Sequence, residues 1–377
     1  MRDKLGKYIK EYSVRNKANE DIPVYSVTNT QGFCQDYFGK EVASKDKSTY
    51  KIVPRGYFAY NPSRINVGSI DWQRNEDRVI VSPLYNVFST SELLDQQYLY
   101  YFLKSDIALQ MIRSAATGSV RDNLKFSMLC EFSTNIPALE MQKGIVRILD
   151  KVKALIDFRQ QELQKLDDLV KARFVEMFGD EQNPFGWETV KVENVADVQV
   201  GVVIKPAQYY TDKNHGVKTF RSLNIGSMYI KDADWVYFTE EGNTKNSKSI
   251  LKENDLLVVR SGAPGTACVV TSEYAGCNAV DIIIAHPNIE KVNPYYLCQY
   301  TNLPHGKKQI DEGTGGAAQQ HFNVGKYNKL KLMLPPLEMQ NDFERFLKQI
   351  DKSKFVVQQA LDKAQLLFDS LMQQYFG

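Results

Sequence analysis

The chain carries one long segment twice, and this repeat limits its possible folds more than any other feature of the sequence. Residues 136–179 and 334–377 align without a gap, and 14 of their 44 paired positions are identical. The identities include the run Leu139–Gln142, which matches Leu337–Gln340, and a Phe-Gly pair that closes each copy. We therefore predict two variable halves, each followed by one copy of a shared structural unit.

Each copy is predicted to form one long helix. After its opening prolines, each copy lacks glycine and proline for most of its length, with Gly144 as an exception. About 40 helical residues would make a rod roughly 60 Å long, which needs a partner along its side.

Apolar residues in both copies recur in steps of four and three, the pattern of a coiled coil, broken at Arg159 in the first copy and at Lys354 in the second. They are Ile145, Leu149, Val152, Ile156, Leu163, Leu166, Val170, Phe174 and Met177 in the first copy, and Phe343, Leu347, Ile350, Val357, Leu361, Ala364, Phe368, Leu371 and Tyr375 in the second. One such seam alone would also suit the core of an ordinary helical hairpin. Two matching seams predict that the helices pack on each other within the chain.

The two variable halves are predicted to be mixed α/β domains. Short alternating apolar runs that end at Gly, Pro or Asn are typical of strands. They occur at 24–29, 57–61, 79–83, 255–260 and 280–286, and a helical stretch follows in each half at 93–113 and 294–308. The fold class is therefore α+β with a pseudo-twofold internal repeat. Its predicted parts are a domain at 1–135, a helix at 136–180, a domain at 181–333 and a helix at 334–377.

Composition limits the class of protein without identifying a partner. Hydrophobic residues make up 43% and charged residues 24% of the chain, as in globular domains. The net charge of +2 is far smaller than the basic excess of many DNA-binding domains. No stretch reaches the roughly 18 apolar residues of a membrane span. Because Met1–Tyr12 also lacks the apolar run of a signal peptide, we expect a cytoplasmic protein without a membrane partner.

The five cysteines are odd in number, scattered, and never in a C-x-x-C spacing. A metal site built from Cys268, Cys277, His286 and Cys298 is the alternative to buried free thiols, and we expect the free thiols and no metal.

Two pairs of loops, at matching places in the two halves, are the candidate binding loops. One pair follows a central strand, at 61–66 and 260–265, and the other precedes the repeat, at 117–121 and 315–321. Arginine can pair with guanine and asparagine with adenine, while glycine lets backbone amides approach a phosphate. The candidate DNA-binding residues are Asn61, Ser63, Arg64, Asn66, Thr117, Ser119, Arg121, Arg260, Ser261, Gly262, Gly316, Gln319, Gln320 and His321. Each alone could be a solvated loop side chain, and Lys205, Lys218, Arg221, Lys307 and Lys308 are weaker candidates.

The repeat resembles that of the specificity subunits of type I restriction-modification systems. The resemblance rests on NIPALEMQ at 135–142 and LMLPPLEMQ at 332–340, and on domain openings such as KLGKYI at 4–9. It implies two target recognition domains that each read one part of a bipartite site in double-stranded DNA, with an antiparallel helix pair setting the gap. It also implies docking of two methyltransferase subunits, which carry S-adenosylmethionine, and through them of restriction subunits. The chain itself would bind no cofactor and have no catalytic residue.

Two other functions remain open from the residues alone. A DNA methyltransferase would need a glycine-rich cofactor loop and an Asn/Asp-Pro-Pro-aromatic motif. The segments that begin at Asn61, Asn183 and Asn293 lack the second proline of that motif, and no convincing helix follows Gly313–Gly316. A coiled-coil adapter that binds only protein is the other alternative, and it predicts no DNA affinity even with partner subunits present.

Overall fold

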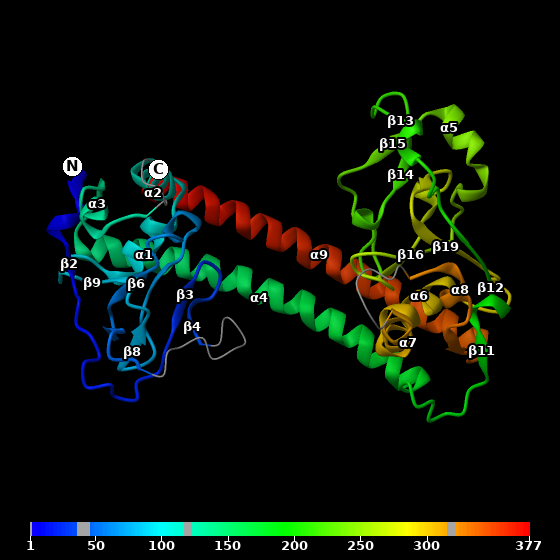
Figure 1. Cartoon of the computed structure of the whole chain (residues 1–377), viewed down its shortest axis with the longest axis horizontal. Coiled ribbons are helices and arrows are strands. Elements are labelled where there is room, and N and C mark those ends of the chain that lie inside the picture. The colour runs from blue at the N-terminus through cyan, green and yellow to red at the C-terminus, as the bar shows by residue number, and fades with distance from the viewer. Residues whose placement is uncertain (1, 36–45, 117–122, 315–321) are drawn as a thin grey trace. The chain divides into compact units, whose positions relative to one another are not determined.

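The computed structural model describes residues 2–35, 46–116, 123–314 and 322–377 (Figure 1). The chain divides into two compact units. The first unit holds Met1–Gln161 and Gln358–Gly377, and the second holds Glu162–Val357. Each unit therefore combines one variable half with parts of both long helices.

The first unit is built on a four-stranded antiparallel sheet in the order β2-β9-β6-β7. Phe58 on β6 lies opposite Phe88 on β9, and their stacked rings have centroids 5.0 Å apart. The strands of this sheet are β2 (Ile9–Glu11), β6 (Phe58–Tyr60), β7 (Ile70–Trp72) and β9 (Asn86–Thr90). Three strand pairs surround it: β1 (Arg2–Lys4) with β10 (Ser133–Asn135), β3 (Ser26–Thr28) with β4 (Gly32–Cys34), and β5 (Lys51–Pro54) with β8 (Arg78–Val81). Its helices are η1 (Leu5–Lys7), η2 (Ile65–Val67), α1 (Gln96–Lys104), α2 (Asp106–Ala116) and α3 (Phe126–Cys130).

The second unit repeats this plan with the sheet order β12-β19-β16-β17. Its strands are β12 (Ala196–Val200), β16 (Leu256–Val259), β17 (Ala267–Val269) and β19 (Ile282–Pro287), and β11 (Thr189–Lys191) pairs with β20 (Lys331–Met333). Its α-helices are α5 (Glu240–Lys245), α6 (Pro294–Asn302), α7 (Pro304–Thr314) and α8 (Val324–Asn328). Its 3-10 helices are η3 (Val192–Asn194), η4 (Pro206–Tyr209), η5 (Ser222–Asn224), η6 (Ser247–Ser249) and η7 (Ser272–Tyr274). A further sheet of β13 (Tyr210–Thr211), β15 (Val236–Phe238), β14 (Val217–Phe220) and β18 (Asn278–Ala279) has no counterpart in the order of the first unit.

The central sheets and the α-helices that follow them match between the two units. The central sheets share one strand order, and α1, α2 and α3 correspond to α6, α7 and α8. The predicted helical stretches at 93–113 and 294–308 are each two helices, because the backbone is extended at Ser105 and Leu303. The predicted α+β class and internal repeat are confirmed.

The helices α4 (Leu139–Phe178) and α9 (Leu337–Phe376) each continue from one unit into the other. In the second unit the Phe343 ring of α9 lies 5.3 Å from that of Phe174 and 5.7 Å from that of Phe178. Later along α9, Lys354 pairs with Asp167 at 2.5 Å. Residues later along α9 thus contact residues earlier along α4, so the helices are antiparallel there, the arrangement that the family resemblance implies.

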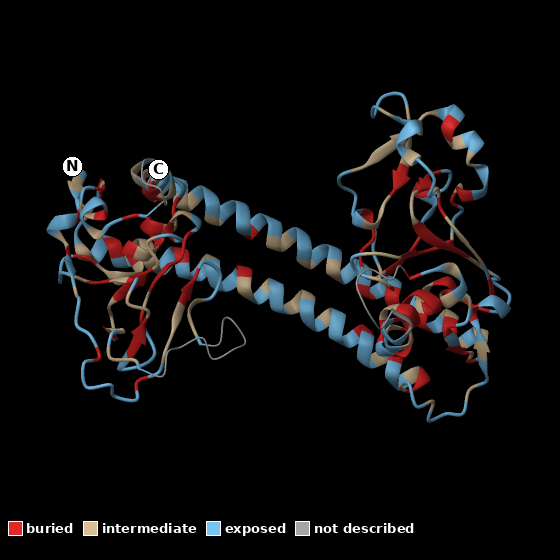
Figure 2. Cartoon of the chain, viewed as in Figure 1, coloured by how far each residue is buried: buried red, intermediate tan, exposed pale blue. Residues whose placement is uncertain are grey.

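The first unit receives the last part of α9. The Phe376 side chain is 5% exposed, and its ring lies 5.1 Å from that of Tyr98 and 6.2 Å from that of Phe102, both on α1. Leu149 of α4 is fully buried in the same apolar cluster. The core of this unit therefore needs residues from both ends of the chain, and Figure 2 shows its buried residues gathered where the helices meet the sheet.

A buried glutamine joins each long helix to its domain. The Gln142 side chain accepts a hydrogen bond from the Asp95 amide (2.9 Å) and donates to the carbonyls of Leu93 (2.9 Å) and Pro137 (2.8 Å). Asp95 also caps α1. In the second unit the equivalent Gln340 accepts from the Asn293 amide (2.8 Å) and donates to the Pro335 carbonyl (2.7 Å), and Asn293 caps α6. The identical run in the two repeats thus includes a buried glutamine that, in both units, bonds the amide of a helix-capping residue and the carbonyl of a proline.

The cysteine thiols are free, and those of Cys268, Cys277 and Cys298 are buried. Burial raises the pKa of Cys268 to about 12 and that of Cys277 to about 11. In the second unit His286 bonds Asp255 (2.6 Å) and Gln199 (2.8 Å) through its two ring nitrogens. Across the described residues no cluster of three or more metal-ligating side chains occurs, and no helix is long and apolar enough to span a membrane.

Candidate nucleic-acid interface

The first candidate loop is a compact turn between β6 and β7. The Asn61 side chain accepts hydrogen bonds from the amide (3.1 Å) and hydroxyl (3.0 Å) of Ser63, while the Arg64 amide donates to the Asn61 carbonyl (3.0 Å). The short helix η2 follows, and Gly68 ends it with a φ of +87° that favours glycine. These local bonds give the turn a defined shape that presents Ser63 and Arg64 to solvent.

Arg64 lines a cavity of about 450 Å³ in the first unit. Asn61 lines it too, and aromatic and polar side chains such as Tyr25, Thr28 and Tyr85 form other parts of its wall. Arg64 is exposed, and within the described residues no hydrogen bond or ion pair engages its guanidinium. Its donors are therefore available to a ligand that offers paired acceptors, as the guanine edge and phosphate do.

The equivalent turn of the second unit holds its arginine differently. The Arg260 side chain is only 15% exposed, forms an ion pair with Asp281, and donates from Nε to the Phe322 carbonyl (3.1 Å). Gly262 has a φ of +84° and open space around it, while Ser261 is half-buried. Some of the hydrogen-bond donors of the Arg260 guanidinium are already engaged by Asp281 and Phe322, so this turn offers a ligand different donors from those of the Arg64 turn.

The two candidate loops of each half lie side by side at one end. The Leu124 amide, just after the first glycine-containing loop, donates to the Pro62 carbonyl (3.1 Å). In the second unit the Phe322 amide donates in the same way to the Arg260 carbonyl (3.2 Å). The predicted contacts Thr117, Ser119, Arg121, Gly316, Gln319, Gln320 and His321 fall outside the described residues. The pairing of loops within each half is thus observed at their described ends, and the role of each side chain stays a prediction.

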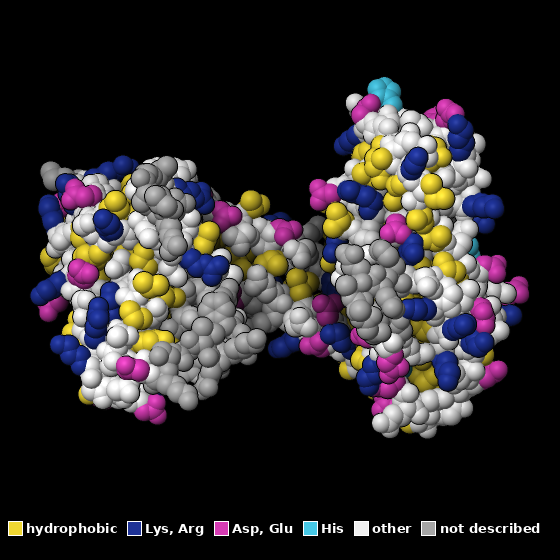
Figure 3. Space-filling view, viewed as in Figure 1, with side chains coloured by type: hydrophobic (Ala, Val, Ile, Leu, Met, Phe, Trp, Pro, Cys, Tyr) yellow, Lys and Arg dark blue, Asp and Glu magenta, His cyan; other side chains and the backbone are white. Residues whose placement is uncertain are grey.

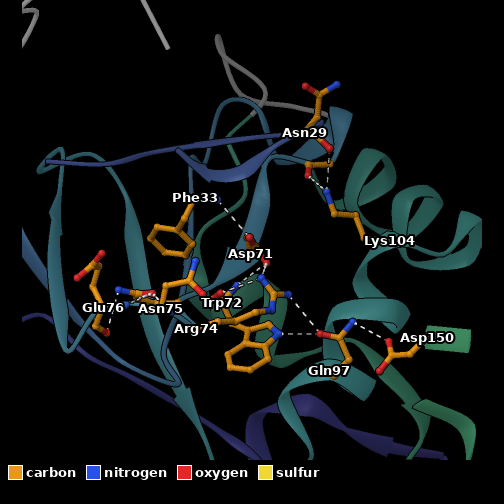
Figure 4. Close-up of polar contacts among 12 residues, drawn as sticks. Asn29, Phe33, Asp71, Trp72, Arg74, Asn75, Glu76, Gln97, Lys104 and Asp150 are labelled. Atoms are coloured by element: carbon orange, nitrogen blue, oxygen red, sulfur yellow. Dashed lines mark hydrogen bonds and ion pairs between the residues drawn. The ribbon is translucent and has the colours of Figure 1, made fainter. Parts of the chain in front are cut away.

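A polar network connects the β3–β4 hairpin and β7, the strand that follows the first turn, to α4 (Figure 4). Asp71, which is 4% exposed, accepts from the Phe33 amide (3.2 Å) and from Arg74 (2.9 Å). Gln97 accepts from Arg74 (3.2 Å) and donates to Asp150 of α4 (3.5 Å). The network therefore links the β3–β4 hairpin, β7, α1 and α4 through charge-assisted hydrogen bonds.

The hairpin itself is built around this network. Gly32 has a φ of +63°, and a Cβ there would lie 2.0 Å from Asp71 Oδ2, so glycine is required. Arg74 lies over the Trp72 ring, 4.4 Å from its centroid. Sequence reasoning did not single out these residues, because their interactions join positions far apart in the chain.

The weaker basic candidates lie mostly in contacts with the protein itself. Lys218 pairs with Asp232 at 2.9 Å, and Lys308 pairs with Glu181. Lys307 donates to the Pro264 carbonyl and Arg221 to that of Asp234, whereas Lys205 is exposed with a φ of +45°. The face in Figure 3 shows Lys and Arg interspersed with Asp and Glu over both units.

Comparisons with known proteins agree on one family. A family model described as the type I restriction modification DNA specificity domain matches residues 4–168 and again 184–363. The type I restriction enzyme MjaVIII specificity subunit of Methanocaldococcus jannaschii is 21% identical over 72% of this chain and 67% of its own. The StySPI specificity subunit of Salmonella potsdam is 20% identical over 97% of this chain and 83% of its own.

Two solved structures share the fold at low identity. A chain from a study of complex assembly and conformational transition of the type I restriction-modification system has a TM-score of 0.60 at 15% identity, and 100% of this chain and 97% of that one are covered. The S subunit of the type I system from M. genitalium has a TM-score of 0.55 at 12% identity, with 100% and 96% covered.

Proposed function

The chain belongs to the family of type I restriction modification DNA specificity domains, and from this premise we propose that it reads a bipartite DNA sequence with one unit for each part. As a specificity subunit it is a DNA-recognition subunit of a type I system rather than a catalytic one. Methylation and cleavage would come from partner subunits, and S-adenosylmethionine would bind to the methyltransferase partner.

The duplicated turn is the observation that carries this proposal. Both units place a turn after the central strand, next to the end of a glycine-containing loop, through equivalent backbone hydrogen bonds. The first turn presents Arg64 with Asn61, whereas the second holds Arg260 against Asp281 and exposes Gly262. One scaffold with two sets of side chains is suited to two different base sequences. Each half would then specify its own part of the site.

The long helices support docking of two methyltransferase subunits. Phe158 of α4 and Leu367 of α9, which are 52% and 50% exposed, belong to the first unit. Val356 of α9 and Leu169 of α4, which are 63% and 47% exposed, are their counterparts in the repeat and belong to the second. Exposed apolar residues at equivalent places in both units suit two copies of one partner.

Exchange of one half tests the bipartite proposal. Residues 1–135 are replaced by the first half of another family member, and methylated motifs are sequenced in a host that also carries the methyltransferase encoded beside this chain. We expect one part of the motif to change and the other to persist. A change in both parts would contradict the modular assignment, and absence of any methylated motif with the unaltered chain would favour the protein-only adapter.

Loss of one apolar pair tests the docking proposal. The Phe158→Asp, Leu367→Asp double variant should bind one methyltransferase subunit in place of two, measured as the mass of the purified complex. The Leu169→Asp, Val356→Asp variant should do the same. Leu84→Asp is the control, since Leu84 is 78% exposed outside the helices. Full stoichiometry in both double variants would show that other surfaces carry the docking.

A further inference from the structure

Lys104, the last residue of α1, holds two separate segments of the first unit. Its ammonium group donates to the carbonyl of Asn29 (3.3 Å) and to that of Gly68 (2.5 Å), as Figure 4 shows for Asn29. Asn29 follows β3, and Gly68 ends the turn that presents Arg64. One side chain on a rigid helix therefore fastens both segments.

Both segments belong to the cavity at the candidate interface. Asn29 lines the cavity on the β3 side, and Arg64, Val67 and Ser69 line it on the side of the turn. The turn is closed at its base by the Asn61 amide, which donates to the Ser69 carbonyl at 3.4 Å. The hydrogen bonds of the Lys104 side chain thus set the distance between the β3 wall and the turn wall of the cavity.

The surroundings of Lys104 are unusual for a lysine that would serve as a simple surface charge. The side chain is half-buried, and desolvation lowers its pKa, an effect that the nearby Asp71 carboxylate opposes. Its ammonium also lies 5.5 Å from the centroid of the Tyr100 ring. The Lys104 ammonium donates to two main-chain carbonyls, so it fixes the positions of the two segments that carry them.

In the second unit a different residue holds the segment that follows the candidate turn. Asn302, the last residue of α6, occupies the place of Lys104 in the repeat. Its side chain donates to the Ala267 carbonyl (2.9 Å) and accepts from the Ala267 amide (3.1 Å). Ala267 begins β17, directly after the turn that carries Arg260. Two different side chains at equivalent positions thus form hydrogen bonds to the segment that follows the candidate turn.

We infer that Lys104 and Asn302 are positioning residues for base recognition, each for the part of the DNA site that its own unit reads. The inference rests on the proposed function. Arg64 can select a base only if its guanidinium reaches the base edge at a fixed angle, because paired hydrogen bonds tolerate little displacement. Lys104 supplies that fixed geometry from behind the turn without contact to DNA.

The test compares Lys104→Met, which keeps the length and removes the donors, with Lys104→Arg, which keeps a charged donor. Each variant is purified in complex with the methyltransferase, and methylation rates are measured on duplexes that vary one base pair at a time. For Lys104→Met we expect discrimination to fall about tenfold at positions in one part of the site, with the other part unchanged. Lys104→Arg should recover part of the loss, and Asn302→Leu should give the reciprocal pattern.

Two controls separate this role from the alternatives. Lys151→Met removes an exposed lysine from α4 in the same unit and should leave discrimination unchanged. Thermal unfolding of each complex shows whether a variant is folded. A uniform loss of binding across all sequences, with a weaker dependence on salt, would make Lys104 a phosphate contact and overturn the inference. Unaltered discrimination in the folded Lys104→Met complex would overturn it as well, whereas no sequence preference in the unaltered complex would instead refute the proposed function.

Discussion

Replacement of the buried glutamines by leucine should destabilise both units. Gln142→Leu would leave the Asp95 amide and the carbonyls of Leu93 and Pro137 without their side-chain partner, whereas Gln340→Leu would leave one amide and one carbonyl. A buried backbone group without a partner costs about 1–3 kcal/mol. Leu93 is 67% exposed, so its carbonyl can bond water once Gln142 is replaced, and each variant then leaves one amide and one carbonyl without a partner. Allowing for the burial of leucine carbons, we expect a loss of about 2–4 kcal/mol for each variant.

Urea unfolding followed by circular dichroism measures these losses, and the two units can unfold in separate transitions. Gln349→Leu is the matched control, because Gln349 is an exposed glutamine on α9 and its replacement should change stability by less than about 0.5 kcal/mol. The reasoning is refuted if Gln142→Leu unfolds like the unaltered chain. An unaltered unfolding transition for Gln340→Leu would refute it for the second unit.

Three further outcomes are expected. His305 is 3% exposed and donates to the Gly179 carbonyl (2.9 Å), and burial lowers its pKa. The contribution of His305 to stability is therefore complete above the unfolded pKa of about 6.5 and is lost as the pH falls. His305→Gln should flatten the dependence of the melting temperature on pH between about pH 5 and 7. Gly265 has a φ of +81°, and a Cβ there would lie 2.6 Å from Ile310, so Gly265→Ala should lower unfolding free energy by about 1–3 kcal/mol in urea titrations, and an unchanged midpoint would contradict this. Insertion of one heptad into both α4 and α9 should lengthen the spacer of the methylated motif, and an unchanged spacer would exclude a ruler role for the helices.

The repeat allowed the helices and the duplicated architecture to be predicted, because it compares the chain with itself. Apolar spacing identified the seam residues, and Phe174 and Phe343 do meet across it. Residue composition of the loops indicated where the candidate turns lie, since turns need glycine, proline and asparagine. These signals are local or periodic, and both kinds can be read along a sequence.

The contacts behind the turns could not be predicted in this way. Lys104 and Asn302 occupy equivalent positions in the two halves but are different residues, so a comparison of the two halves does not identify them. The engagement of Arg260 by Asp281 depends on a strand pairing that brings distant residues together. The sheet formed by β13, β14, β15 and β18 also lies outside the repeated pattern, which gave no reason to expect it.

The division of each long helix between the units bears on the order in which the protein can fold during synthesis. The first unit includes residues 358–377, and Phe376 lies inside its apolar cluster. A ribosome that has made only the first half has therefore not yet produced part of that unit's interior. The second unit, whose residues are contiguous, can close before the first, so the domain that is translated earlier is the later one to be completed.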